Sequence, residues 1–291
     1  MKKINLILTI VMLAVISCQQ SKPQQSASEE PSSLSLTKIW ETDTLLHTPE
    51  SVIYDEFRDV LYVANIGNTP PSNPDLDGFI SILSTSGEVL NRKWVTGISS
   101  SKGMGIIDSS LFVTDINTLV EIDIPSAKII NTFKLEGAGF LNDITIGPDN
   151  VVYVSDSDNN SIYQLKNGES EIIHADSTIR RINGLLFRDD KIIVAGFHSG
   201  NIYSFDPKSL TKTIIADSVF KADGINAIGD DLIISCWIGK IYLVKPDGSI
   251  SVLIDLEEDK RGTADAWYID SINTLFVPTF FGNTVIAYKV E

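Results

Sequence analysis

Histidine and cysteine are scarce in this chain, and their scarcity excludes several kinds of site. The 291 residues include three histidines and two cysteines, Cys18 and Cys236. Dedicated zinc sites use histidine or cysteine ligands, and the set of candidate metal ligands described below contains neither, which argues against a zinc site. Cys236 follows an apolar run with a strand pattern, so we interpret it as a core residue and not as a reactive thiol.

The sequence also lacks the local motifs of several common enzyme classes. It contains no G-x-S-x-G nucleophile elbow, no H-E-x-x-H zinc motif and no G-x-x-x-x-G-K phosphate loop. Beyond the N-terminal segment, no stretch has the periodicity of a helix. These absences argue against a serine hydrolase of the elbow type, a zinc protease and a nucleotide-binding fold.

Positive charge is in the minority. The chain has 38 Asp and Glu residues against 23 Lys and Arg residues, for a formal net charge of −15. An acidic protein is repelled by nucleic-acid phosphates and by anionic lipid surfaces, and it accumulates cations. We therefore expect no nucleic-acid partner.

The first residues predict an exported lipoprotein. Lys2 and Lys3 precede an apolar run over residues 4–16, which is typical of a secretory signal and too short for a membrane-spanning helix. The motif Val15-Ile16-Ser17-Cys18 is similar to a bacterial lipobox, in which the cysteine becomes the lipidated first residue. The alternative is an ordinary signal peptide with an incidental cysteine. We predict a lipoprotein signal peptide over residues 1–17 and attachment to the cell envelope, facing the periplasm or the cell surface, through the lipid anchor alone.

A tether and one large domain are expected to follow. Residues 18–34 are predicted to be the lipidated cysteine and a flexible tether, since residues 19–33 carry no aliphatic side chain beyond alanine. Residues 35–291 are long enough for a single all-β domain, which we expect to be a monomer. If Cys18 is lipidated, no intramolecular disulfide is possible.

Polar residues open successive repeats at near-constant spacing. From Asn142 to Asn183 is 41 residues, from Asn183 to Asp223 is 40, and Asp265 lies 42 further on. Each repeat continues with short runs rich in β-branched and aromatic residues, which are typical of strands. Six units begin near Glu50, Gly103, Asn142, Asn183, Asp223 and Asp265. Repeats of this length predict an all-β, six-bladed β-propeller of four-stranded blades.

The two ends of the chain are predicted to share one blade. The last unit offers only three strand patterns before the sequence ends at Glu291, whereas an orphan strand pattern over residues 35–40 precedes the first unit. We therefore predict that the N-terminal strand supplies the fourth strand of the last blade and closes the ring.

Four polar side chains at matched positions predict a metal site on the propeller axis. Glu50 and Asp223 contribute carboxylates, and Asn142 and Asn183 contribute amide oxygens. Such a set suits a hard divalent cation, Ca²⁺ above all. For any one of these residues alone, a local turn or cap is the alternative.

Aromatic side chains are predicted to wall a substrate pocket around this site. The loops that join the second and third strands of the blades open on the same face as the metal ligands. They carry Phe197, His198, Trp237, Phe280 and Phe281. We interpret His198 as a contact at the rim and not as a catalytic group.

Four short motifs together resemble the SMP-30/gluconolactonase/LRE family of six-bladed propellers and, more distantly, the paraoxonases. They are Pro49-Glu50, Asn142-Asp143, Asn183-Gly184-Leu185 and Asp223-Gly224, and the resemblance spans roughly residues 36–290. It implies that Glu50, Asn183 and Asp223 bind one divalent metal, that Asn142 is a further ligand or a substrate contact, and that Asp223 is the general base in lactone hydrolysis.

One position departs from the family pattern. Sugar-lactone members often carry Arg two residues before the Asn that matches Asn142, and this chain has Phe140 there. We therefore expect Phe140 to contact the substrate, and the aromatic rim to favour a less polar small-molecule lactone or ester. The alternative is a non-catalytic binding propeller, similar to NHL-type modules, with a structural metal or a ligand-docking face.

Overall fold

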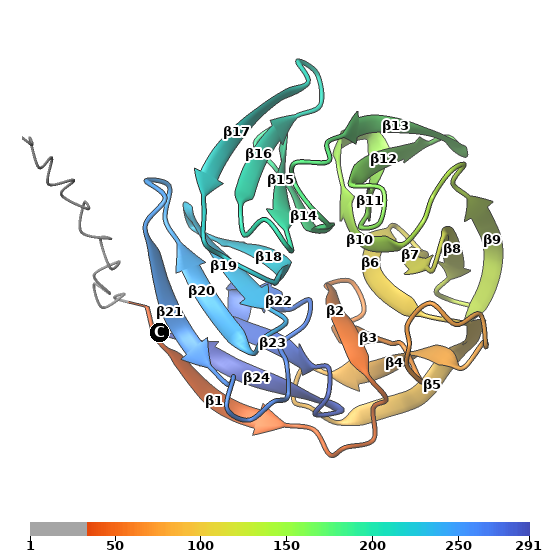
Figure 1. Ribbon diagram of the computed structural model, residues 1–291. Helices are drawn as coiled ribbons and strands as arrows, with labels where there is room; N and C mark the ends of the chain where they lie inside the picture. The colour runs from red at the N-terminus through yellow and green to blue at the C-terminus, as the bar shows by residue number, and fades with distance from the viewer. Residues whose placement is uncertain (1–33) are drawn as a thin grey trace, which may run out of the picture.

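The computed structural model describes residues 34–291. The predicted signal peptide, Cys18 and nearly all of the predicted tether lie outside the described residues. Six four-stranded antiparallel sheets surround a central axis, each with its strands in radial order (Figure 1). The six-bladed propeller predicted from the repeats is therefore confirmed. No helix within residues 34–291 is long and apolar enough to cross a bilayer.

The first three blades follow the chain order from the axis outward. Blade 1 contains β2 (Pro49–Asp55), β3 (Val60–Asn65), β4 (Gly78–Ser84) and β5 (Val89–Ile98); blade 2 contains β6 (Ser101–Ile107), β7 (Ser110–Asp115), β8 (Thr118–Asp123) and β9 (Lys128–Lys134); blade 3 contains β10 (Leu141–Ile146), β11 (Val152–Asp156), β12 (Ser161–Lys166) and β13 (Glu169–Ala175).

The remaining blades repeat this order until the last, which draws on both chain ends. Blade 4 contains β14 (Ile182–Arg188), β15 (Lys191–Gly196), β16 (Ile202–Asp206) and β17 (Thr211–Ala216); blade 5 contains β18 (Ala222–Ile228), β19 (Asp231–Cys236), β20 (Lys240–Val244) and β21 (Ile250–Asp255); blade 6 contains β22 (Trp267–Ile269), β23 (Thr274–Thr279), β24 (Thr284–Val290) and β1 (Leu36–Glu41).

The N-terminal strand closes the ring, as predicted. Strand β1 pairs antiparallel with β24, from Leu36 opposite Val290 to Glu41 opposite Ile286. Just beyond β1, the Thr42 hydroxyl accepts a 3.0 Å hydrogen bond from the backbone N–H of Val285. The outer edge of the last blade is thus covered by the start of the chain.

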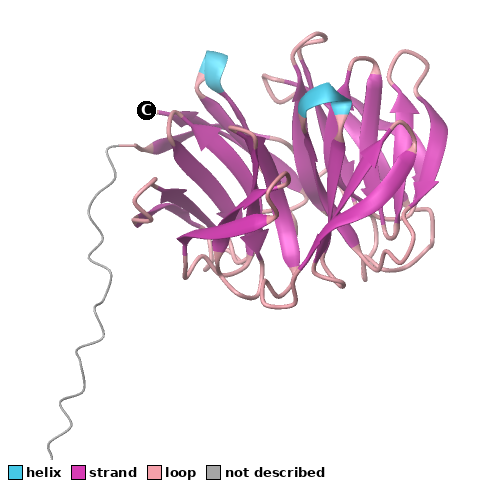
Figure 2. Cartoon of the chain, turned by 90° about the horizontal axis from the view of Figure 1, so that it is seen from above, coloured by secondary structure: helices cyan, strands magenta, loops and turns pink. Residues whose placement is uncertain are grey.

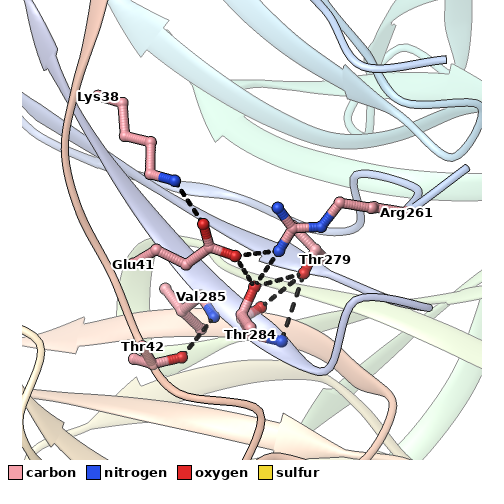
Figure 3. Close-up of polar contacts among 7 residues, drawn as sticks. All are labelled: Lys38, Glu41, Thr42, Arg261, Thr279, Thr284 and Val285. Atoms are coloured by element: carbon pink, nitrogen blue, oxygen red, sulfur yellow. Dashed lines mark hydrogen bonds and ion pairs between the residues drawn. The ribbon is translucent and has the colours of Figure 1, made fainter. Parts of the chain in front are cut away.

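A polar cluster fastens this closure (Figure 3). The Glu41 carboxylate accepts hydrogen bonds from Lys38, from Arg261 and, at 2.9 Å, from the Thr284 hydroxyl. Thr284 also contacts the Thr279 hydroxyl at 2.8 Å. One carboxylate therefore links β1 to the loop before β22 and to β24.

The core lies between neighbouring blades. The inner strands are apolar and buried, and blades 1 and 6 meet through Leu61, Val63, Phe276 and Ala287, all fully buried. The outermost strands are mostly exposed, as in β9. Cys236 is buried as a free thiol at the end of β19, which confirms its interpretation as a core residue.

Two short 3-10 turns mark one face of the propeller. The turn η1 (Pro148–Asn150) joins β10 to β11, and η2 (Asp270–Ile272) joins β22 to β23. Both lie on the same face (Figure 2). The loops that enter the innermost strands lie at the other ends of those strands, so the candidate site described next opens on the opposite face.

Candidate functional site

A cavity of about 260 Å³ lies where the loops enter the innermost strands. The side chains that line it include Glu50, Asn142, Asn183 and Asp223, the four predicted metal ligands. Five of the six predicted substrate contacts line it as well: Phe140, Phe197, His198, Trp237 and Phe280. Residues that are far apart in the sequence thus converge on one pocket at the axis.

Phe281 is the predicted contact that the structure does not place in the cavity lining. Its side chain is 54% exposed. The ring packs edge-on against Trp237 and Phe280, with centroid distances of 5.1 and 4.9 Å. Phe281 therefore supports the wall from outside.

A β-bulge at the start of the innermost strand in five of the blades places one residue of each blade around the axis; we call these five residues the ring. In blade 3, pairing jumps from Leu141 opposite Asp156 to Ile144 opposite Val154, so that two residues of β10 face one residue of β11. The same irregularity occurs at the matching point of blades 1, 2, 4 and 5. The first residues of the bulges are Glu50, Lys102, Asn142, Asn183 and Asp223, and all five line the cavity.

Lys102 is the ring member that the sequence reading missed. The predicted repeat start in blade 2 was Gly103, one residue further along. The Lys102 side chain is only 1% exposed, and its Nζ donates a 3.0 Å hydrogen bond to the backbone oxygen of Ser100. A buried ammonium thus stands in the same ring as the carboxylates.

The register of blade 6 also differs from the repeat spacing. Ser51, which directly follows the ring residue Glu50, forms a parallel bridge with Asp265. Asp265 is therefore one step below the ring, and Ala264 occupies the ring position of this blade. The carboxylate of Asp265 accepts a 2.6 Å hydrogen bond from the Ser51 hydroxyl.

Asp143 shares this lower level with Asp265. Its carboxylate accepts hydrogen bonds from the N–H groups of Ile144 and Leu185, at 2.7 and 2.6 Å. Both acids also line a second cavity, of about 430 Å³, on the other side of the axial residues. The centre of the propeller thus holds four carboxyl groups, two in the ring and two below it; Glu50, Asp143 and Asp223 are buried and Asp265 is partly buried.

Burial and mutual repulsion disfavour the ionised forms of these acids. Burial raises the pKa of Glu50 well above its usual value, Asp223 and Asp265 raise it further, and Lys102 opposes the change. Burial and Asp265 likewise raise the pKa of Asp223, whereas the hydrogen bond from Asn183 lowers it. Burial also lowers the pKa of Lys102 to about 8, against the opposing effect of Glu50 and Asp115. One ammonium cannot balance four carboxylates, so the centre favours a further cation or bound protons.

The donor set fits a hard cation in two respects. Glu50 Oε2 is buried and has no hydrogen-bond partner within the described residues. The Nδ2 groups of Asn142 and Asn183 donate to Ser157 Oγ at 3.3 Å and to Asp223 Oδ1 at 2.6 Å, which leaves both amide oxygens available. Within residues 34–291 no three His, Cys, Asp or Glu side chains are grouped as metal ligands. A cation here would depend on the two amide oxygens as well as the two carboxylates.

Comparison with known proteins supports the fold alone. No protein-family model matches the chain, and no curated protein matches it in sequence. Solved propellers do match it in structure. The fold is similar to that of virginiamycin B lyase. The resemblance to the SMP-30/gluconolactonase family remains a prediction from the motifs.

Three solved structures illustrate this likeness. A catalytically inactive variant of the Staphylococcus aureus lyase with quinupristin has a TM-score of 0.61 and 15% identity, covering 88% of this chain and 98% of that one. The selenomethionine form of the same lyase has a TM-score of 0.62 and 14% identity, covering 88% and 99%. A streptogramin B lyase has a TM-score of 0.61 and 12% identity, covering 89% and 97%.

Proposed function

We propose that the axial cavity is the active site of a hydrolase that depends on a divalent cation, Ca²⁺ above all, and opens a small lactone or cleaves an ester. The observation that carries this proposal is the buried Oε2 of Glu50, which has no hydrogen-bond partner among residues 34–291, in a ring that also holds Asp223 and two amide oxygens. The motif resemblance to lactonase-type propellers agrees with it.

In this proposal the ring residues have two roles, cation binding and proton acceptance. Glu50, Asn142, Asn183 and Asp223 hold the cation, which supplies Lewis-acid polarisation of the substrate carbonyl when bound. Asp223 accepts the proton of the attacking water. Its Oδ1 accepts the 2.6 Å hydrogen bond from Asn183 and has a second lone pair that would serve the cation, so Oδ2 is the atom available as the base.

The wall of the cavity selects the substrate. Trp237 contacts Phe280 and Phe197 with centroid distances of 5.5 and 6.5 Å, and this aromatic surface is suited to an apolar acyl or ring portion. In this proposal the aromatic side chains also limit the access of water to the axial polar residues, which strengthens electrostatic interactions inside the cavity.

Hydrolysis of a panel of lactones and aryl esters tests the proposal. The full chain is assayed with Ca²⁺ and with chelator, beside Asp223→Asn and the matched control Asp217→Asn, an exposed acid six residues earlier. We expect Asp223→Asn to lower turnover by about 100-fold or more, and Asp217→Asn to leave it unchanged. Full activity in Asp223→Asn would contradict the proposal.

One observation favours a second candidate, a non-catalytic binding propeller. The buried Lys102 ammonium already offsets part of the negative charge of Glu50, so the ring can hold together without a metal. In that case the wild-type protein turns over no member of the panel but still binds small molecules in the cavity.

The N-terminal segment supports export and lipid anchoring as a further part of the proposal. Strand β1 begins at Leu36, so residues 18–34 are available to link Cys18 to the propeller. Cys18→Ser is expected to abolish metabolic labelling with palmitate and to release the protein from the membrane fraction. Unchanged labelling in Cys18→Ser would contradict the lipid anchor.

A further inference from the structure

Three cationic side chains line the axial cavity of a protein whose formal net charge is −15. They are Lys102 in blade 2, Arg181 at the entry to blade 4 and Lys221 at the entry to blade 5. The acids of the site lie in the ring and below it. Lys102 therefore lies among the acids of the ring, whereas Arg181 and Lys221 make the entrance of the cavity basic.

Backbone geometry fixes the two outer cations. Arg181 and Lys221 each stand two residues before a ring residue, and both have left-handed backbone angles, with φ of 67° and 62°. Their backbone oxygens accept hydrogen bonds of 2.8 Å from the N–H groups of Phe197 and Trp237. The same local turn in neighbouring blades thus holds two positive side chains beside the same opening.

These cations are not fully neutralised by the protein. Within residues 34–291 Lys221 forms no ion pair, and its Nζ lies 4.5 Å from the centroid of the Phe197 ring. Arg181 pairs with Asp158 at 3.2 Å, where both side chains are partly exposed.

Lys102 is the cation with the strongest need for a partner. Its ammonium has three N–H donors, yet within the described chain it makes one hydrogen bond, to Ser100. Its Nζ also lies over the face of Phe140, 4.5 Å from the ring centroid, and interacts electrostatically with Glu50 and Asp115 without a hydrogen bond to either one among the described residues. A buried ammonium with unused donors favours an anionic or strongly polar oxygen in the cavity.

Part of the cavity wall is apolar. Ile66, Pro71, Trp237 and Phe280 form it, from the loops of blades 1, 5 and 6. Ile66 and Phe280 are nearly fully buried and pack in one cluster beside Trp237. The cavity thus combines cations from blades 2, 4 and 5 with apolar surface from blades 1, 5 and 6, and Phe140 and Phe197 pack against two of the cations.

We infer that the ligand of this cavity is a small organic anion. Its acidic group, a carboxylate or a phosphate monoester, is bound by Lys102, Arg181 and Lys221, and its apolar or aromatic body packs on Trp237 and Phe280. This inference names the substrate class of the proposed hydrolase and rests on that proposal for turnover. Binding itself does not require hydrolysis and is measured separately.

Quenching of Trp237 fluorescence by three probes of similar shape tests the inference. The probes are phenylacetate, phenyl phosphate and neutral phenylacetamide, titrated into the full-length protein, and Trp237→Phe identifies the signal. Charge-assisted hydrogen bonds predict that at least one anion binds about 10-fold more tightly than the amide. The two anions distinguish a carboxylate site from a phosphate site. Equal binding of all three probes would overturn the inference.

Charge-removing variants localise the effect. The double variant Arg181→Gln and Lys221→Gln should lose most of the anion preference, whereas binding of phenylacetamide stays the same. Arg180→Gln removes the same type of charge from a neighbour that does not line the cavity, so its preference should match wild type. Melting temperatures confirm that the variants are folded. An unchanged preference in a folded double variant would also overturn the inference.

The outcome is independent of the hydrolase test. If the anion preference is found but no lactone or ester is turned over, the proposed function fails and the ligand class stands. If turnover is found without anion preference, the ligand class fails and the hydrolase stands.

Discussion

Asn183 donates a 2.6 Å hydrogen bond from its Nδ2 to Oδ1 of Asp223, which lies in the next blade. This bond orients the amide so that its oxygen is left free, and it holds one oxygen of the carboxylate in place. The other carboxylate oxygen is free for a proton or a cation. Two residues 40 positions apart thus act as one polar unit.

Removing one buried acid is expected to stabilise the cation-free protein. Glu50→Gln keeps the shape of the side chain but removes a charge that burial and neighbouring acids disfavour. We expect the melting temperature in chelator to rise by about 2–4 °C, which corresponds to roughly 1 kcal/mol for a domain of this size. Glu56→Gln, at an exposed position of the same blade, is the control and should show little change. A lower melting temperature for Glu50→Gln would contradict the description of an electrostatically strained ring.

Lys102 is expected to oppose cation binding. Its ammonium lies in the ring and interacts favourably with Glu50, so it competes with any cation for the same carboxylate. Lys102→Met keeps the length of the side chain and removes the charge. Ca²⁺ affinity should increase by about 10-fold, since repulsion between nearby charges at a partly buried site is worth 1 kcal/mol or more. Weaker binding in a folded variant would show that Lys102 supports the cation site.

The stability of the blade closure is expected to depend on pH through Glu41. Burial raises the pKa of Glu41, but the hydrogen bonds from Arg261, Lys38 and Thr284 outweigh burial and bring the pKa from 4.5 to about 2. A pKa that is lower in the folded protein means that ionised Glu41 stabilises the fold above about pH 4.5. The contribution is lost as the pH falls from 4.5 towards 2.

Thermal melts of Glu41→Gln at several pH values measure this effect. At pH 7 the variant should melt about 2–4 °C below wild type, in line with a loss of roughly 1 kcal/mol, and the difference should shrink as the pH approaches 2. Glu88→Gln, at an exposed position whose carboxylate has no hydrogen bond or ion pair in the described structure, should not differ from wild type at any of these pH values. A difference that is constant with pH would mean that Glu41 acts through packing.

The repeat pattern was sufficient to predict the fold. Apolar, β-branched strands recur at a nearly constant period, and the missing fourth strand of the last blade has one source, the N-terminal strand that pairs with β24. Four ring residues were also found because Glu, Asn and Asp at matched spacing form a recognisable set. A closed ring of repeats makes sequence spacing equivalent to spatial convergence.

The remaining site residues depend on details that spacing does not contain. Lys102 has a residue type that does not fit a set of oxygen ligands, so the repeat start was placed at Gly103. The spacing predicted that Asp265 begins the last repeat, but it lies one residue after the ring position, because the number of residues from one blade to the next varies by one. Arg181 and Lys221 line the cavity from left-handed turns, and these turns could not be predicted because neither position carries the glycine or asparagine that usually marks such a conformation.

Calorimetric titration of Ca²⁺ into the chelator-treated protein tests the central claim most directly. Wild type, Glu50→Gln and Asp223→Asn are compared, with Glu56→Gln as the control. The proposed site predicts one Ca²⁺ per chain in wild type and in the control, and a loss of binding in both ring variants. Absence of binding in wild type, or equal binding in all four proteins, would contradict the claim that the axial ring is a cation site.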